Sequence, residues 1–328
     1  MARCIQLATN GFLRSKPNPM VGAVIVCDNR ILAEGYHVRF GEGHAEVNAF
    51  RAVKPEDEPL LPRATLYVNL EPCSHYGKTP PCTELIIKKN IRRVVVGSVD
   101  PFAEVQGRGI RQLREAGIDV CVGVLEADCL LLDRRFMIFH QKRRPYITLK
   151  WAQTANLLID HQFCALAIST PFTQMLVHQL RATQDAILVG KTTDDREHPQ
   201  LNVRHWHGAD PLRLVLTRKQ SIESLLTDLY TRNIQTLLVE GGAKTHQAFI
   251  DAGLWDEIHI ETAPFTVVGG TKAPHLPTEM RLIDRKRYDG NTLDTFISPF
   301  LLTLQHRSNK INGCYSLAHN FSHLKQMK

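Results

Sequence analysis

The chain has 328 residues, of which 43% are hydrophobic and 22% are charged, and its formal net charge is +7. This length exceeds what one hydrophobic core usually fills, so two domains are expected, and the composition is that of an ordinary globular protein. No apolar run approaches the roughly 18 residues of a membrane span, which excludes an integral membrane protein. The N-terminus lacks the apolar core of a signal peptide, so we expect a cytoplasmic protein.

The positive charge gathers at the end of the chain. Residues 301–328 hold four basic residues and no acidic one, so the remainder is only mildly basic. Such a body suits a small phosphorylated ligand as well as a nucleic acid. His306, His319 and His323 in this segment do not follow a known metal-ligand spacing, and we interpret it as a basic extension of unknown role. The eight cysteines do not suggest a disulfide scaffold in a chain of this length.

Strands and helices are predicted to alternate along the first half. The expected helices cover 2–14, 44–53, 83–90, 108–116 and 126–140. The expected strands cover 21–27, 30–35, 64–69, 93–98 and 119–123. This alternation implies a sheet layered between helices. The basic run 142–145 should link this domain to the next.

The second half is predicted to follow the same pattern. We expect strands at 146–150, 186–190, 212–216 and 236–239, and helices at 171–182 and 222–231. Pro171 in the first turn is typical of a helix start. The last of these strands runs into Gly241-Gly242, and a glycine pair at a helix start can cradle a phosphate. Taken alone, the pair is equally compatible with a tight turn.

A potential metal site organises the first half. His44, Cys73 and Cys82 offer one imidazole and two thiolates, which can form three corners of a tetrahedral zinc site and leave the fourth for water. Zinc lowers the pKa of such a water towards about 7. Glu46 beside the metal could then carry protons between this water and a leaving amine.

The order His-x-Glu followed by Pro-Cys is typical of zinc-dependent nucleobase deaminases, although their signature closes with Cys-x-x-Cys. Here eight residues separate Cys73 from Cys82. The second thiol can still reach the metal if this loop turns sharply, and Gly77, Pro80 and Pro81 are suitable turn residues.

With these motifs, the first 140 residues resemble the deaminase half of the bifunctional riboflavin-biosynthesis enzyme, a pyrimidine deaminase joined to a reductase. The matching pieces are 17–26, 35–37, 43–49, 70–82, 100–101 and 107–109. The resemblance implies a cytidine-deaminase-like three-layer αβα domain over residues 1–143, with zinc on His44, Cys73 and Cys82 and with Glu46 as the catalytic residue. It also implies substrate binding by Asn18 at a pyrimidine edge, and by His75 and Lys78 at a ribose phosphate.

The second half resembles the reductase half of the same enzyme, which is similar to dihydrofolate reductase in fold and uses NADPH. The matching pieces are 180–182, 186–190, 199–204 and 239–243. The resemblance implies an α/β domain over residues 144–300. It places the cofactor near Ala152, Thr193, Glu197, Gly242, Ala243, Lys244, Thr245, His246, Gln247 and Ala248. It places substrate near Arg181, Leu201, Arg204 and Glu240, and two arginines suit a phosphate because the guanidinium fork matches its oxygens.

Several positions depart from this family. Asn156-Leu157 stands where Asp-Gly is usual, Glu197 where an aspartate is usual, and Ala165 and Ala167 where a serine and a tryptophan are common. The span between residues 216 and 221 is also shorter than usual. These departures bear on cofactor affinity and reductase rate, and no proton donor for the reduction is evident.

We therefore expect a bifunctional enzyme. It would deaminate 2,5-diamino-6-(5-phosphoribosylamino)pyrimidin-4(3H)-one with Zn²⁺ and then reduce the ribosyl group to ribityl with NADPH. Its partners would be this small phosphorylated pyrimidine and further copies of itself in a homo-oligomer, with no nucleic acid and no membrane. One alternative is a zinc deaminase acting on a nucleic-acid base, although the aromatic residues of the first domain are scattered. The other is an active deaminase with an impaired reductase domain, which the departures favour somewhat.

Overall fold

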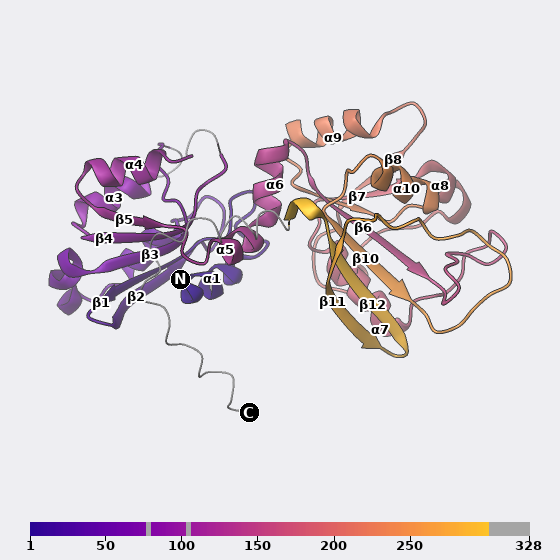
Figure 1. The fold of residues 1–328 in the computed structure, drawn as a ribbon, viewed down its shortest axis with the longest axis horizontal. Coiled ribbons are helices and arrows are strands. Elements are labelled where there is room, and N and C mark those ends of the chain that lie inside the picture. Colours follow the sequence, from indigo (N-terminus) through magenta and orange to yellow (C-terminus); the bar gives the residue numbers. More distant parts are fainter. Residues whose placement is uncertain (77–79, 103–105, 302–328) are drawn as a thin grey trace. The chain divides into compact units, whose positions relative to one another are not determined.

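The structure is a computed structural model that describes residues 1–76, 80–102 and 106–301 (Figure 1). The described chain divides into two compact units, residues 1–133 and 134–301. The domain limits 1–143 and 144–300 stay a prediction, and all of the predicted extension except Leu301 lies outside the described residues. Among the described helices, none combines the length and the apolar character that crossing a membrane would require.

The first unit contains a five-stranded sheet in the order β2-β1-β3-β4-β5. Its strands are β1 (Gly22–Cys27), β2 (Arg30–Tyr36), β3 (Thr65–Leu70), β4 (Arg93–Ser98) and β5 (Asp119–Val122). Its α-helices are α1 (Ala2–Ala8), α2 (Ala45–Arg51), α3 (Cys82–Lys88), α4 (Arg108–Glu115) and α5 (Glu126–Leu132). Strand β1 runs antiparallel to β2 and β3, whereas β3, β4 and β5 are parallel.

Helices cover both faces of this sheet. On one face, α2, α3 and α4 bury Ala49, Ile86 and Leu113 against the strands. On the other face, α1 packs Cys4 and Leu7 against β1. The strands of this sheet carry apolar residues at successive positions, and successive residues point to opposite faces. Both faces of the sheet are therefore apolar, and both need a helical cover. The predicted three-layer arrangement is confirmed (Figure 1).

Two predicted helices are wrong in extent. The first ends at Ala8 and continues only as a 3-10 turn, Thr9–Gly11. The helix predicted over 126–140 is two helices, α5 and α6 (Arg134–Lys142), interrupted at Asp133. The buried Asp133 carboxylate accepts hydrogen bonds from the Met20 backbone N–H at 2.8 Å and the Asn69 amide at 3.4 Å. This tertiary contact, which apolar periodicity cannot reveal, fixes the residue where the helix breaks.

The second unit contains a seven-stranded sheet in the order β11-β12-β10-β6-β9-β7-β8. Its strands are β6 (Tyr146–Gln153), β7 (Ala186–Gly190), β8 (Leu212–Leu216), β9 (Thr236–Val239), β10 (Glu257–Thr262), β11 (Arg281–Tyr288) and β12 (Asn291–Ile297). Besides α6, its helices are α7 (Pro171–Arg181), α8 (Lys191–Glu197), α9 (Ile222–Thr231) and α10 (Ala243–Asp251).

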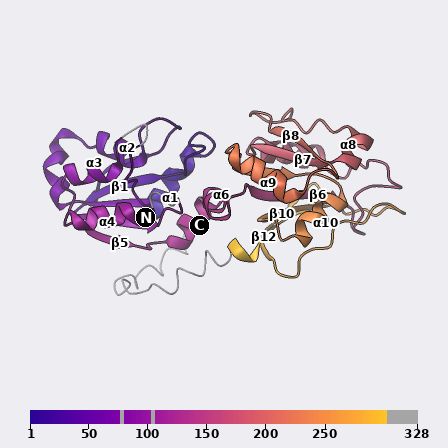
Figure 2. The same cartoon turned by 90° about the horizontal axis from the view of Figure 1, so that it is seen from above.

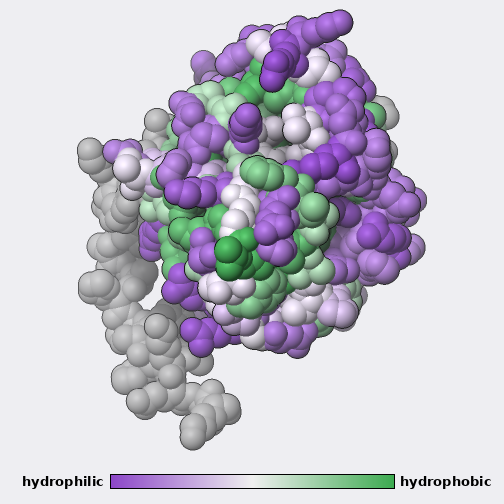
Figure 3. All heavy atoms as spheres, turned by 90° about the vertical axis from the view of Figure 1, so that its right-hand side faces the viewer, coloured by the Kyte–Doolittle hydropathy of each residue, from purple (hydrophilic) through white to green (hydrophobic). Residues whose placement is uncertain are grey.

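Helices again lie on both sides of the sheet (Figures 1 and 2). Helices α9 and α10 bury Leu229 and Phe249 on one face, whereas α7 packs Leu180 on the other. The parallel strands β6, β7, β9 and β10 bring their carboxyl ends to the same edge of the sheet, which is where ligands bind in open α/β sheets. The face of this unit seen in Figure 3 carries apolar side chains surrounded by hydrophilic ones.

Candidate active sites

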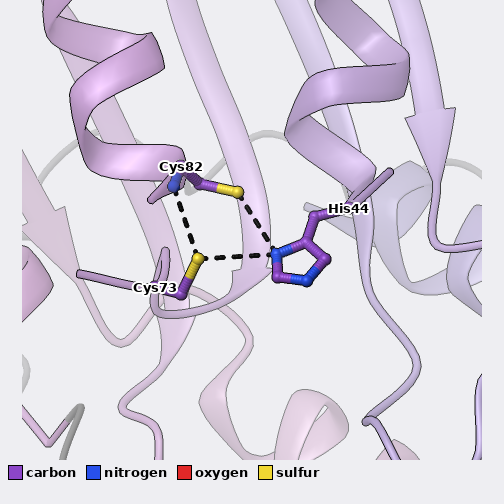
Figure 4. Close-up of side chains that lie close together, drawn as sticks. All are labelled: His44, Cys73 and Cys82. Carbon is purple, nitrogen blue, oxygen red and sulfur yellow. Dashed lines mark hydrogen bonds between the residues drawn. The ribbon is translucent and has the colours of Figure 1, made fainter. Parts of the chain in front are cut away.

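Three potential metal ligands meet in the first unit (Figure 4). His44 lies directly before α2, Cys73 follows β3, and Cys82 opens α3. His44 Nδ1 is 3.4 Å from each of the two sulfur atoms. Tetrahedral zinc, with bonds of about 2.0 Å to nitrogen and 2.3 Å to sulfur, separates such ligand atoms by about 3.5 Å. The donor set and its spacing therefore fit zinc.

The charge state of these ligands also suits a cation. The hydrogen bond from Cys82 lowers the pKa of Cys73 to about 4, while sharing the same proton raises the pKa of Cys82. The Cys73 sulfur in turn raises the pKa of His44. The thiol pair therefore carries one negative charge already, and a bound metal would displace the remaining proton.

Backbone contacts hold Cys73 from two sides. The Cys82 N–H donates to Cys73 Sγ at 3.3 Å, and the Thr83 N–H donates to the Cys73 carbonyl at 3.2 Å. Two residues before Cys73, the buried carboxylate of Glu71 accepts the backbone N–H groups of Gly107 and Gly109 at 2.9 and 3.0 Å. Since Gly109 lies in the first turn of α4, Glu71 ties the ligand loop to that helix, and sequence reasoning had assigned this residue no role.

Glu46 lies in the first turn of α2, two residues after His44, with only 3% of its surface exposed. Burial raises the pKa of this carboxyl, and the Cys73 charge raises it further. A buried carboxyl beside a metal site is well placed for proton transfer, as the sequence suggested.

Asn18 is connected to this cluster through His37, a residue of the matching piece 35–37 to which the sequence had assigned no role. The Asn18 amide nitrogen is 3.2 Å from His37 Nε2, and His37 Nδ1 is 3.1 Å from the Gly43 carbonyl oxygen. The ring of His37 packs edge-on against that of His44 at 5.4 Å. Because Nδ1 must donate to the carbonyl, Nε2 accepts from the amide. This arrangement leaves the Asn18 carbonyl oxygen for a ligand.

Of the other two predicted substrate residues, the structure describes only His75. His75 is exposed, and its ring is 6.4 Å from that of Phe102. Lys78 lies outside the described residues.

The second unit contains a cavity of about 300 Å³ beside the carboxyl ends of its parallel strands. Seven of the predicted ligand-binding residues line it: Ala152, Thr193, Glu197 and Gly242 of the cofactor set, and Arg181, Arg204 and Glu240 of the substrate set. These residues come from separate strands, helices and loops, so the fold brings together what the sequence had only suggested by resemblance.

Two of the substrate residues bind each other. Arg181 Nε and Nη2 donate to the two Glu240 carboxylate oxygens at 2.8 and 2.7 Å, and Nη1 donates to the Asn202 carbonyl at 3.1 Å. Burial alone would raise the pKa of Glu240, but the Arg181 hydrogen bonds outweigh it and the pKa is lowered. The fourth predicted substrate residue, Leu201, packs its side chain in the core with Ile187 and Val189 and is not among the residues that line the cavity.

The glycine pair does stand at a helix start. Gly242 directly precedes α10, and its N–H donates to Thr193 Oγ1 at 3.1 Å. A Cβ atom on Gly242 would lie 2.7 Å from this oxygen, so the close approach requires glycine. Backbone N–H groups at a helix start without side chains in the way fit the pyrophosphate of a dinucleotide cofactor.

The remaining predicted cofactor residues, Ala243 to Ala248, belong to α10 itself and are not among the residues that line the cavity. His246 is fully enclosed, with Nε2 3.1 Å from the carbonyl oxygens of both Lys150 and Val239. Burial lowers its pKa to about 4. His246 therefore ties α10 to strands β6 and β9.

Of the departures noted in the sequence, Ala167 and Glu197 line the cavity. Leu157 has φ of 62°, in the left-handed region that favours glycine, the residue usual there in the family. Asn156 bridges this turn to the backbone of Val267 at 2.9 Å.

Comparison with known proteins extends these observations. Residues 1–98 match the model of the cytidine and deoxycytidylate deaminase zinc-binding region, and residues 145–224 and 219–286 match that of the RibD C-terminal domain. Riboflavin biosynthesis protein RibD of Bacillus amyloliquefaciens is 35% identical over 84% of this chain and 86% of its own length. The chain belongs to the RibD family.

Solved structures agree with this assignment. A diaminohydroxyphosphoribosylaminopyrimidine deaminase/5-amino-6-(5-phosphoribosylamino)uracil reductase from Thermotoga maritima is 34% identical, with a TM-score of 0.81 over 91% of this chain and 97% of that one. RibD of Acinetobacter baumannii is 30% identical, with a TM-score of 0.80 over 90% and 97% of the two chains. The chain is thus a zinc-dependent deaminase fused to an NADPH-dependent reductase, as the sequence predicted.

Proposed function

We propose that this RibD-family chain catalyses two successive steps of riboflavin biosynthesis, with the residue roles given below. The first is hydrolytic deamination of 2,5-diamino-6-(5-phosphoribosylamino)pyrimidin-4(3H)-one, and the second is reduction of its ribosyl group to ribityl. The observation that carries the proposal is the group of three ligand atoms from His44, Cys73 and Cys82, with the buried Glu46 two residues from the first of them.

In the deaminase half, His44, Cys73 and Cys82 would hold zinc, which when bound supplies a nucleophilic water at neutral pH. Glu46 takes a proton from the attacking water and passes it to the departing amine. Asn18, oriented by His37, offers its carbonyl oxygen to an N–H of the pyrimidine. His75 and Lys78 contribute at the ribose phosphate.

In the reductase half, the residues that line the cavity divide between the two ligands. NADPH, when bound, supplies the hydride. Gly242 and the N-terminal turn of α10 bind the phosphates of NADPH. Ala152, Thr193 and Glu197 form the rest of the cofactor-binding part of the cavity. Arg204 meets the substrate phosphate, Leu201 contributes its backbone, and the Arg181–Glu240 pair shapes the wall between them.

Ammonia release and NADPH consumption, followed separately in the purified zinc-replete protein, test the proposal. We expect both signals from the diaminopyrimidinone substrate. Glu46→Gln should lower ammonia release by about 10²–10⁴-fold and leave reduction of the deaminated intermediate unchanged. Ammonia without NADPH consumption would favour the impaired reductase, and no ammonia from the wild type would contradict the assigned substrate.

A homo-oligomer that acts in the cytoplasm on this small phosphorylated pyrimidine, without nucleic acid, completes the proposal. Light scattering on the purified protein tests the assembly: a mass equal to that of the single chain at micromolar concentration would contradict it.

A further inference from the structure

A buried carboxylate lies directly behind the reductase cavity. Glu261, near the end of β10, is 2% exposed, and none of the ion pairs among the described residues includes it. Its Oε2 accepts a hydrogen bond from Ser169 Oγ at 2.5 Å, and its Oε1 accepts one from Asn291 Nδ2 at 2.6 Å. An enclosed carboxylate held only by neutral donors is costly to bury, and such groups concentrate at functional sites.

Ser169 connects this carboxylate to the cavity, because it lines the cavity wall. Asn291 also donates to the Ile168 carbonyl at 3.1 Å, so the wall at residues 168–169 is fixed to the start of β12. The position of the Ser169 hydroxyl is therefore determined by the sheet rather than by its own loop.

The hydrogen bond to Glu261 decides what Ser169 can bind. A hydroxyl has one proton to donate, and here it points towards the carboxylate. Only oxygen lone pairs remain for the cavity, and the adjacent negative charge strengthens them as acceptors. A ligand group at this point must be a hydrogen-bond donor, and a phosphate would be repelled.

Basic residues, which favour phosphate, line the same cavity. Arg204 lines it and uses Nη1 for a hydrogen bond to Asn202 Oδ1 at 3.0 Å, while the charge of Arg181 is balanced by Glu240. Arg196, which also lines the cavity, is paired with Asp160. The cavity therefore presents two further basic residues, Lys150 and Arg204, together with a polarised acceptor at Ser169. A sugar phosphate, with hydroxyl donors and an anionic end, matches both.

We propose that Ser169, polarised by Glu261, accepts a hydrogen bond from a ribosyl hydroxyl of the reductase substrate. The inference rests on the proposed function, because it takes the ligand to be a ribosyl phosphate. Ser169 contacts the substrate, and Glu261 is a positioning residue that acts through it. Ser169 would thus provide a hydroxyl four residues after Ala165, the position at which a serine is usual in the family.

Calorimetric titration of the full chain with ribose 5-phosphate and with inorganic phosphate, without NADPH, tests this site. The wild type should bind the sugar phosphate more tightly than phosphate alone. Ser169→Ala should weaken ribose 5-phosphate binding about tenfold and leave phosphate binding unchanged, whereas Ser169→Thr should recover it. Arg204→Ala should weaken both ligands. Unchanged binding of inorganic phosphate, which uses the same unit, confirms that each Ser169 variant is folded.

Glu261→Gln gives the matching control for the positioning role. Alone it should weaken ribose 5-phosphate binding about threefold, and in the Ser169→Ala background it should have no further effect, which a general loss of structure would not produce. Equal affinity of Ser169→Ala and wild type, or a wild type that does not prefer the sugar phosphate, would overturn the inference. If the wild type prefers ribose 5-phosphate to phosphate but consumes no NADPH with the deaminated substrate, the proposed reduction is contradicted and the Ser169 site is not.

Discussion

In the deaminase half, the donor atoms converge on an open position, whereas in the reductase half many predicted ligand residues are hydrogen-bonded to one another. His44, Cys73 and Cys82 point at a common centre and share a proton that a metal replaces. Arg181 and Glu240 neutralise each other, and Thr193 occupies the N–H of Gly242. The first site depends on an ion to complete it. In the second site, the Arg181–Glu240 pair and the Gly242 turn are satisfied by the protein's own groups, so these residues support the protein as well as the ligand.

The sharpest test of this difference removes a metal ligand. Cys82→Ser should abolish zinc binding and ammonia release, because two remaining ligands cannot hold the ion in a tetrahedral site. Reduction of the deaminated intermediate should persist, since it takes place in the other unit. Zinc content by atomic absorption and the two assays measure this, with Cys121→Ser as the control. Full zinc content in Cys82→Ser would contradict the ligand assignment.

Breaking the ion pair of the reductase half should mainly affect stability. Arg181→Ala leaves the carboxylate of Glu240, which is 9% exposed, without its partner. We expect a loss of about 3–5 kcal/mol in the free energy of unfolding of the second unit. Urea unfolding measures it. The double variant Arg181→Met/Glu240→Leu should recover most of the loss, and a stable Arg181→Ala protein would mean that the pair does not support the fold.

The buried histidine of α10 makes the second unit sensitive to acid. The folded-state pKa of His246, about 4, lies below the roughly 6.5 of an unfolded histidine, so the unfolded chain binds the extra proton. Its contribution is complete above pH 6.5 and is lost as the pH falls towards 4, by up to about 3 kcal/mol. Unfolding at several pH values should show a flatter profile for His246→Gln. If the free energy of unfolding of His246→Gln depends on pH as steeply as that of the wild type, a group other than His246 is responsible.

The smallest expected effect is at the glycine turn. Thr193→Val removes the acceptor for the Gly242 N–H, which is worth about 1 kcal/mol, and the KM for NADPH should rise about fivefold. Steady-state kinetics measure this, with Thr192→Val, an exposed neighbour, as the control. If both variants behave alike, the Thr193 contact does not position the cofactor site.

The same contrast explains how far the sequence could be interpreted. Metal ligands have few chemical equivalents, and His44, Cys73 and Cys82 lie within one stretch, so their types and order predicted the site before the fold was known. Glu71 and His37 were missed because their roles consist of contacts with backbone and side chains far along the chain. A carboxylate that receives amide N–H groups leaves no pattern in its own neighbourhood.

The reductase cavity was predictable only by resemblance. Its polar groups come from different elements, and Glu261 meets Ser169 where Asn291 of β12, the strand paired with β10, binds both Glu261 and the Ile168 carbonyl. The last strands were not predicted at all: β11 reads Arg-Leu-Ile-Asp-Arg-Lys-Arg-Tyr, is largely exposed and lacks the apolar alternation that marks a strand. Pairing with β12, rather than burial, defines it.

The anchoring of Cys73 and Cys82 has a practical consequence for engineering. Cys73 is held through Glu71 and the start of α3, and Cys82 is itself the first residue of that helix. Both metal ligands therefore have anchors outside the stretch that separates them. We expect that substitution of His75, a described residue of that stretch, changes the choice of pyrimidine substrate while the zinc content of the protein stays the same.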